Sequence, residues 1–273
     1  MSQSFINNIL KGVGKKLGKA FYNPYRKIQL SWTQVRVLKN LPDYGNNSIS
    51  LFHHKIFFHG RNEFLHGLNE IFIDEIYKIE LSPNSRIIDG GAHIGLSVIY
   101  LKRICPTSFI TAFEPDDQNF NLLKQNVQSF QLQNVDIRKE AVWVANTELN
   151  FSNEGNMASK IEIDNSREGI KVKAIRLNEI INDKVHLLKL DIEGAEYDVM
   201  KDIENKLSFV DNIFLEYHGK FYQSNELIEL LQILKRNQFT FYIKEAQPSY
   251  PTPFYREDAN PDYDIQLNIF CFR

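Results

Sequence analysis

Most of the chain alternates between short apolar runs, which end in polar or glycine-rich turns, and longer stretches of helical spacing. The short runs are typical of buried strands, and an apolar residue every three or four positions indicates an amphipathic helix. Strands are expected at residues 86–89, 109–114, 135–144, 187–191 and 212–218, and helices at 94–104, 117–130, 197–207 and 225–237. This alternation predicts an α/β fold with a parallel sheet covered on both faces.

The last two apolar runs, 239–243 and 265–272, have no helical stretch between them. One of these strands should therefore enter the sheet antiparallel to its neighbour. The segment 148–176 carries turn signals at Glu154-Gly155-Asn156 and Glu168-Gly169, which indicate hairpins. Parallel sheets bind ligands beyond the carboxyl ends of their strands, so the candidate site is expected at that edge.

The first part of the chain has a different pattern. Residues 6–21 carry apolar positions at helical spacing with lysines on the opposite side. This segment either rests on an anionic membrane or a partner, or packs on its own domain. Residues 48–58 predict two short strands around His53 and His54, and 62–80 predict a helix. We expect a basic N-terminal extension at 1–60 and the main domain at 61–273.

The charge is unevenly distributed along the 273 residues. The formal net charge of the whole chain is −2. The first 40 residues hold eight Lys and Arg and no acidic residue, so the remaining residues carry a formal charge of −10. An acidic body argues against nucleic acid as a partner. No apolar run spans a bilayer and the first residues lack a secretory signal, so a cytoplasmic protein is expected. Cys105 and Cys271 are expected to be buried free thiols.

Candidate chemistry begins at Ser85–Ser97, a strand followed by a glycine turn and a helix start. The missing Cβ atoms of Gly90, Gly91 and Gly95 let a backbone approach a ligand closely. The turn misses the dinucleotide pattern G-x-G-x-x-G because Ala92 replaces a glycine. Asp89 at the strand tip would repel a pyrophosphate but attract an ammonium group. Glu114 can accept hydrogen bonds from both hydroxyls of a ribose. An adenosyl amino acid therefore fits better than NAD.

Four ordered motifs then carry a family resemblance: Ile88-Asp-Gly-Gly-Ala-His-Ile-Gly, Phe113-Glu-Pro, Lys189-Leu-Asp-Ile-Glu-Gly-Ala-Glu and Leu215-Glu-Tyr-His. Over residues 62–245 the chain resembles the FkbM family of class I S-adenosylmethionine-dependent methyltransferases. The resemblance implies a Rossmann-like sheet of seven mostly parallel strands with an antiparallel C-terminal strand. Two positions depart from the family pattern: His93 stands where Asn is usual, and Asn178 where Asp is usual.

The resemblance also implies a cofactor site. Asp89, Gly91 and His93 should border the methionine part of S-adenosylmethionine, and Gly95 should open the helix. Glu114 should hold the ribose and Pro115 should shape the adenine pocket, with Glu140 or Ala141 on its far side. The full expected set is Asp89, Gly90, Gly91, Ala92, His93, Gly95, Glu114, Pro115, Glu140, Ala141, Asp191 and Glu193.

Two further strand ends supply candidate catalytic residues. Lys189, Asp191 and Glu193 share one face of their strand, and Glu216 and His218 share a face of the next. His218 is the candidate base for deprotonating an alcohol, because an imidazole titrates near neutral pH and Glu216 or Asp191 could orient it.

Lys189 is either an ion-pair partner of Asp191 or a functional group. Asp191, Glu216 and His218 could alternatively hold a divalent cation, although no metal is included among the expected cofactors.

The leading hypothesis is an S-adenosylmethionine-dependent O-methyltransferase. The resemblance suggests a sugar, polysaccharide or natural-product hydroxyl as acceptor, and the basic N-terminus suggests a peripheral membrane or glycan-assembly partner. The aromatic loop 247–263, with Tyr250, Phe254, Tyr255 and Tyr263, is either an acceptor lid or a surface excursion. Two alternatives stay open: a nicotinamide-dependent oxidoreductase, and a catalytically silent scaffold that binds the cofactor.

Overall fold

The computed structural model describes residues 23–151, 161–162, 170–256 and 262–273. The chain divides into two compact units, Met1–Ile76 and Tyr77–Arg273. The helix expected at residues 6–21 lies outside the described residues. Within the described part of the chain, no helix is both long enough and apolar enough to cross a bilayer.

The smaller unit contains one hairpin and several short helices. Its elements are η1 (Pro24–Ile28), α2 (Trp32–Lys39), β1 (Asn47–Leu51), β2 (His54–Phe58), α3 (Arg61–Gly67) and η2 (Leu68–Ile73). The two strands expected around His53 and His54 form an antiparallel pair. Phe58 of β2 stacks on Phe64 of α3 with ring centroids 4.0 Å apart. The compact unit includes α3 and ends at Ile76. Its last helix ends at Ile73 instead of continuing to residue 80.

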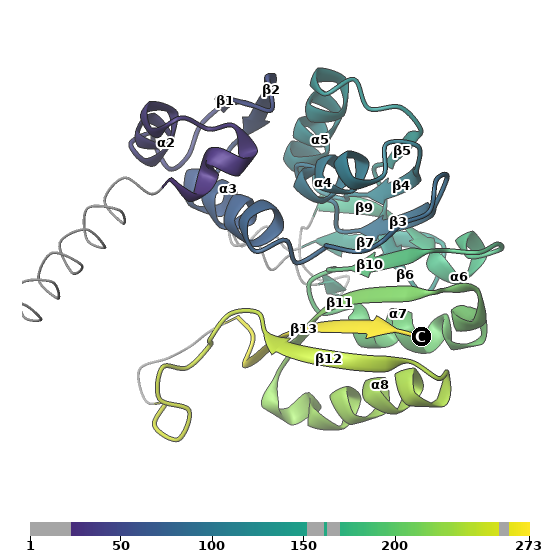
Figure 1. Cartoon of the computed structure of the whole chain (residues 1–273). Coiled ribbons are helices and arrows are strands. Elements are labelled where there is room, and N and C mark those ends of the chain that lie inside the picture. The colour runs from purple at the N-terminus through teal and green to yellow at the C-terminus, as the bar shows by residue number, and fades with distance from the viewer. Residues whose placement is uncertain (1–22, 152–160, 163–169, 257–261) are drawn as a thin grey trace, which may run out of the picture. The chain divides into compact units, whose positions relative to one another are not determined.

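The larger unit is built on a seven-stranded sheet with the order β12-β13-β11-β10-β3-β4-β5 (Figure 1). Its strands are β3 (Arg86–Gly90), β4 (Phe109–Phe113), β5 (Val135–Arg138), β10 (Leu187–Leu190), β11 (Asn212–Gly219), β12 (Thr240–Glu245) and β13 (Ile265–Phe272). The neighbours from β11 to β5 pair in parallel, whereas β13 is antiparallel to both β11 and β12. The predicted Rossmann-like α/β fold with an antiparallel C-terminal strand is confirmed.

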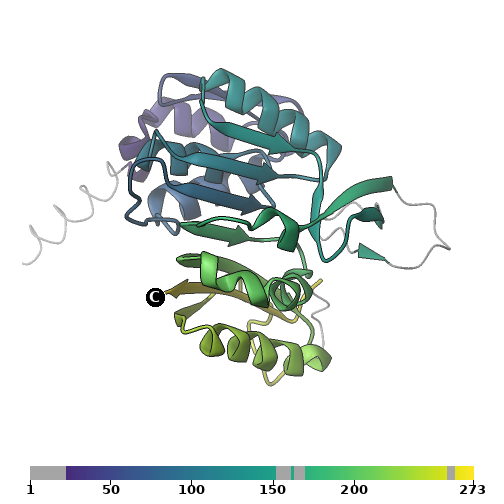
Figure 2. The same ribbon diagram turned by 90° about the vertical axis from the view of Figure 1, so that its right-hand side faces the viewer.

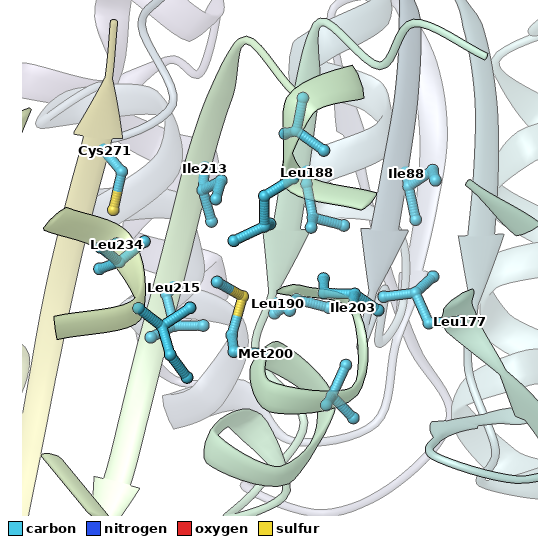
Figure 3. Packing of buried hydrophobic residues seen from close by; sticks show 14 of the residues in the cluster. Ile88, Leu177, Leu188, Leu190, Met200, Ile203, Ile213, Leu215, Leu234 and Cys271 are labelled. Carbon is cyan, nitrogen blue, oxygen red and sulfur yellow. The ribbon is translucent and has the colours of Figure 1, made fainter. Parts of the chain in front are cut away.

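Helices cover this sheet because its strands are apolar on both faces. They are α4 (Leu96–Ile104), α5 (Asp117–Ser129), α6 (Leu177–Ile180), α7 (Glu196–Asp202), η3 (Glu204–Phe209), η4 (Phe221–Gln223) and α8 (Ser224–Arg236). Leu188 and Leu190 of β10 belong to the same core cluster as Met200 of α7 and Leu234 of α8 (Figure 3). Side chains alternate along a strand, so Lys189 projects to the opposite face of the sheet.

Two expected elements are divided. The strand expected at 135–144 becomes β5 and β6 (Ala141–Trp143), and β6 joins a separate sheet with the order β6-β9-β7-β8. This small sheet extends away from the large one (Figure 2) and contains β7 (Thr147–Phe151), β8 (Ile161–Glu162) and β9 (Ile170–Arg176). The hairpin expectation for 148–176 is confirmed where the chain is described, because β7 pairs antiparallel with β9. The helix expected at 197–207 is divided into α7 and η3.

Candidate functional site

The glycine turn after β3 packs directly on the backbone at the end of β10. Gly91 has a φ of +79°, and a Cβ built on it would lie 1.8 Å from the carbonyl oxygen of Asp191. Only glycine fits here, because any side chain would collide with backbone that cannot move aside. The sequence predicted that Gly91 lies close to a ligand. In the structure Gly91 lies close to the backbone of Asp191.

A buried ion pair joins the same two strands. Asp89 is fully buried, and its Oδ1 lies 3.1 Å from the Nζ of Lys189. The other carboxylate oxygen accepts a hydrogen bond from Ser97 at 2.5 Å. The Nζ also donates to the carbonyl of Gly91 at 2.7 Å and lies 3.5 Å from Asp191 Oδ2. Lys189 therefore ties the turn to β10 through Asp89 and Asp191 together, rather than through Asp191 alone.

The charge on this lysine is maintained by its partners. Burial acts to lower the pKa of Lys189, but the carboxylates of Asp89 and Asp191 outweigh burial and raise it. Since Asp89 has partners inside the protein, its direct contact with a cofactor stays a prediction. The residues that follow, Gly90 to Gly95, connect β3 to α4, and Gly95 is the N-cap residue of α4 with a φ of +90°.

Glu114 connects the end of β4 to the same turn. One carboxylate oxygen accepts the backbone N–H of His93 at 2.7 Å, and the other accepts that of Asp116 at 2.9 Å. The side chain is nearly fully buried, and this burial raises the pKa of Glu114 to about 7 against the contributions of those hydrogen bonds. His93 adopts a left-handed φ of 50°, a conformation that Asn tolerates better than most residues.

The remaining expected cofactor residues lie farther along the chain. Pro115 is half-buried directly after Glu114. Glu140 forms an ion pair with Lys173, and Ala141 is buried in the core of the small sheet. Their contacts with a cofactor stay predictions.

The second group of candidate residues meets at the ends of β10 and β11. The Nε2 atom of His218 lies 3.7 Å from Glu216 Oε1 and 3.8 Å from Glu193 Oε2. Asp191, Glu193 and His218 each offer a ligand atom, and these atoms lie within 4.8 Å of one another. The structure therefore brings together residues that the sequence assigned to one edge of the sheet.

Glu196 orients the imidazole, and sequence reasoning missed it. Its Oε1 lies 3.1 Å from His218 Nδ1, whereas Oε1 of Glu216, one of the expected partners, lies 3.7 Å from Nε2. Glu196 is fully buried and accepts the backbone N–H groups of Ile192 at 3.0 Å and Gly194 at 3.1 Å. Glu196 is the last acid of the Lys189–Glu196 motif and the first residue of α7, and this position was the signal in the sequence.

These carboxylates change the protonation of the imidazole. Burial acts to lower the pKa of His218, but Glu196, Glu193 and Asp191 outweigh it and raise the pKa to about 10. The expectation that this imidazole titrates near neutral pH is therefore wrong for the protein without ligands. These carboxylates therefore favour the protonated form of the ring.

The aromatic loop reaches the site at its C-terminal end. The hydroxyl of Tyr263 donates to the carbonyl of Glu193 at 2.8 Å, and its ring lies 4.8 Å from that of His218. Tyr250 instead stacks on Phe221, with centroids 5.7 Å apart. Phe254 and Tyr255 are exposed. Of the four aromatic residues singled out in the sequence, Tyr263 is the one that the structure places against His218.

The first prediction concerns Glu196. We expect Glu196→Ala to lower the free energy of unfolding by about 3–5 kcal/mol, since it leaves buried N–H groups and a buried imidazolium without their acceptor. Glu229→Ala is the matched control, because Glu229 is a helix surface residue paired with Lys201, and it should cost about 1 kcal/mol or less. Urea unfolding measures both. Equal losses in the two variants would contradict the role given to Glu196.

A second prediction follows from Glu114. Its pKa rises from 4.5 to about 7 on folding, so the folded state binds the proton more tightly and loses this stability as the pH rises through that window. We therefore compare the free energy of unfolding of the wild type with that of Glu114→Gln. The difference, wild type minus variant, should fall by on the order of 3 kcal/mol as the pH rises from 4.5 to about 7.

Urea unfolding at several pH values measures this difference. The same comparison with Glu148→Gln, at an exposed glutamate of β7, should stay nearly constant with pH. A Glu114→Gln curve that runs parallel to that of the wild type would show that Glu114 keeps its ordinary pKa.

Comparison with known proteins agrees with this geometry. The model of the methyltransferase FkbM domain matches residues 89–241, more than half of the chain. The chain is 29% identical over 198 residues to methyltransferase 1 of Beauveria bassiana, covering 61% of this chain and 79% of that protein. It is 28% identical over 186 residues to methyltransferase sdnD of Sordaria araneosa, covering 54% and 72%.

Among solved structures, the chain is similar to the methyltransferase FkbM from Methylobacillus flagellatus KT. The TM-score is 0.51 at 15% identity, and the match covers 76% of this chain but 48% of that one. This likeness supports the fold, and the family match covers the glycine turn, Glu114 and the cluster around His218. The chain belongs to the FkbM methyltransferase domain family.

Proposed function

We propose that this methyltransferase uses S-adenosylmethionine and methylates a hydroxyl group on a sugar, polysaccharide or natural product. The observation that carries the proposal is the cluster of Asp191, Glu193, Glu216 and His218 beside the glycine turn. In such sheets, ligands bind beyond the carboxyl ends of the strands, where the turn and the cluster both lie.

The charge of this edge supports the cofactor. Two basic side chains, Lys189 and His218, lie among five carboxylates. The carboxylates are those of Asp89, Asp191, Glu193, Glu196 and Glu216. A sulfonium that also carries an ammonium group is attracted to such a site, whereas the pyrophosphate of NAD is repelled. The nicotinamide alternative is therefore not favoured. Glu114 is the proposed ribose contact.

The cluster also supports the choice of a hydroxyl acceptor. Methyl transfer from a sulfonium is an in-line displacement, so the protein must hold the nucleophile against the methyl group. An alcohol must in addition lose its proton, and a neutral amine does not need this help. His218 and its carboxylates are proposed to activate the alcohol. Tyr263 is proposed to cover the acceptor, with the exposed rings of Phe254 and Tyr255 available to stack on a sugar.

A third prediction tests this proposal. Isothermal titration calorimetry on the full chain should show binding of S-adenosylmethionine and none of NAD. Incubation with methyl-labelled cofactor and a panel of glycans and small alcohols should then identify an acceptor. We expect His218→Ala to lower turnover by about 100-fold or more, while affinity for the cofactor stays near that of the wild type.

The control variant is His66→Ala, since the side chain of His66 is 67% exposed and lies in the smaller unit; it should keep full turnover. Binding of NAD without binding of S-adenosylmethionine would overturn the proposal. Cofactor binding with no transfer to any acceptor would favour the silent scaffold, and unchanged turnover in His218→Ala would remove His218 from the reaction.

A further inference from the structure

We propose that Asp191, Glu193 and His218 bind one divalent cation of the Mg²⁺ or Mn²⁺ class. The site lies at the position where the proposed function places the acceptor hydroxyl. The role of the ion in the reaction rests on that proposed function. The binding itself follows from the contacts of the three side chains.

The separations of the donor atoms fit a shared ion. Ligands about 2.0–2.3 Å from one ion lie roughly 3–4 Å apart. His218 Nε2 lies 3.8 Å from Glu193 Oε2, and the donor atoms of Asp191, Glu193 and His218 all lie within 4.8 Å of one another. A hydrogen bond between nitrogen and oxygen is shorter, about 2.7–3.2 Å. His218 Nε2 and Glu193 Oε2 are therefore at the spacing of two ligands of one ion, and the donor atom of Asp191 lies within 4.8 Å of both.

The surroundings of the imidazole support the same site. The side chain of His218 is 4% exposed, and its Nε2 has no hydrogen-bond acceptor within 3.5 Å among the described residues. Its nearest carboxylate oxygens are those of Glu216 and Glu193, at 3.7 and 3.8 Å. Because these two distances are longer than a hydrogen bond, an ion can lie between Nε2 and the carboxylates.

The other ring nitrogen has the partner that a metal-binding histidine needs. Nδ1 lies 3.1 Å from Oε1 of the fully buried Glu196. A carboxylate on the far nitrogen fixes the ring orientation and increases the basicity of the nitrogen that binds the metal. Because Glu196 is itself held by backbone N–H groups of the Asp191–Glu196 segment, the ligands and their support are one connected unit.

The backbone fixes the second ligand as well. Glu193 adopts a left-handed φ of 55° and is followed by Gly194 at 97°. This conformation is unfavourable for a glutamate, and the bond from Tyr263 to the Glu193 carbonyl helps to hold it.

The site is also open on one side. The side chains of Asp191 and Glu193 are 28% and 34% exposed. Water or an acceptor oxygen can therefore complete the coordination, as Mg²⁺ and Mn²⁺ sites require. The ion would stabilise the alkoxide, and the hydroxyl proton would leave to solvent. His218 would then act as a ligand of the ion and not as the base.

The experiment uses Mn²⁺ as the probe on the full chain purified without metal. We expect equilibrium dialysis and electron paramagnetic resonance to show one bound Mn²⁺ per chain. The spin-echo spectrum should show a directly coordinated ¹⁴N nucleus, which disappears in His218→Gln. Glu193→Gln should weaken Mn²⁺ binding by about 10-fold or more, whereas Glu148→Gln, the exposed control on β7, should bind as the wild type does. Thermal unfolding without metal checks that each variant is folded.

Three results would overturn the inference: no binding at millimolar Mn²⁺, bound Mn²⁺ without a ¹⁴N signal, or equal affinity in the wild type and a folded Glu193→Gln. Binding of Zn²⁺ in preference to Mn²⁺ would overturn the assigned class of ion. Titration with S-adenosylmethionine in a metal-free buffer separates this inference from the proposed function. Cofactor binding without Mn²⁺ binding refutes the cation site alone, and Mn²⁺ binding without cofactor binding refutes the proposed function alone.

Discussion

The buried ion pair between Lys189 and Asp89 holds the ends of β3 and β10 together, and the candidate site depends on it. An ammonium group in the interior is tolerated only when its charge and its N–H groups are matched. Lys189 meets both conditions through Asp89, Asp191 and the carbonyl of Gly91. The same contacts bring the glycine turn so close to β10 that Gly91 can have no side chain.

From this pair the site extends outward in order of decreasing burial. Asp89 and Lys189 lie inside, Glu196 and His218 come next, and Asp191 and Glu193 are partly exposed. The inner residues have ion-pair or hydrogen-bond partners within the protein, whereas Nε2 of His218 lies 3.8 Å from the partly exposed carboxylate of Glu193. This gradient is what a binding site for a cation requires, because the outer groups keep their capacity to interact while the inner groups fix their positions.

The sequence was sufficient for the sheet, and it assigned the candidate residues to strand ends that the sheet brings together. Apolar periodicity predicted each strand of the large sheet, and the lack of a helix before residues 265–272 predicted the antiparallel β13. It was not sufficient for pairings between residues far apart. The expected ion pair of Lys189 with Asp191 is present, but the parallel register also places Lys189 opposite Asp89, and no local pattern shows that register.

Burial explains the other differences. The acid that orients His218 proved to be Glu196, on a helix rather than on a strand, because the turn at Gly194 bends the chain back toward β11. The pKa of His218 is raised because three carboxylates surround it, a property of the assembled site that residue type alone does not reveal. Glu140 forms an ion pair with Lys173, because the chain leaves the large sheet after β5, and its contact with a cofactor stays a prediction.

The central claim, that Lys189 and Asp89 act as one unit, is tested most directly by a double-mutant cycle on the free energy of unfolding. Lys189→Met alone should cost about 3–5 kcal/mol, because it leaves the buried Asp89 carboxylate without its cation. Adding Asp89→Asn should recover a large part of that loss, giving a coupling energy of about 2 kcal/mol or more. Effects that add to within about 0.5 kcal/mol would contradict the claim.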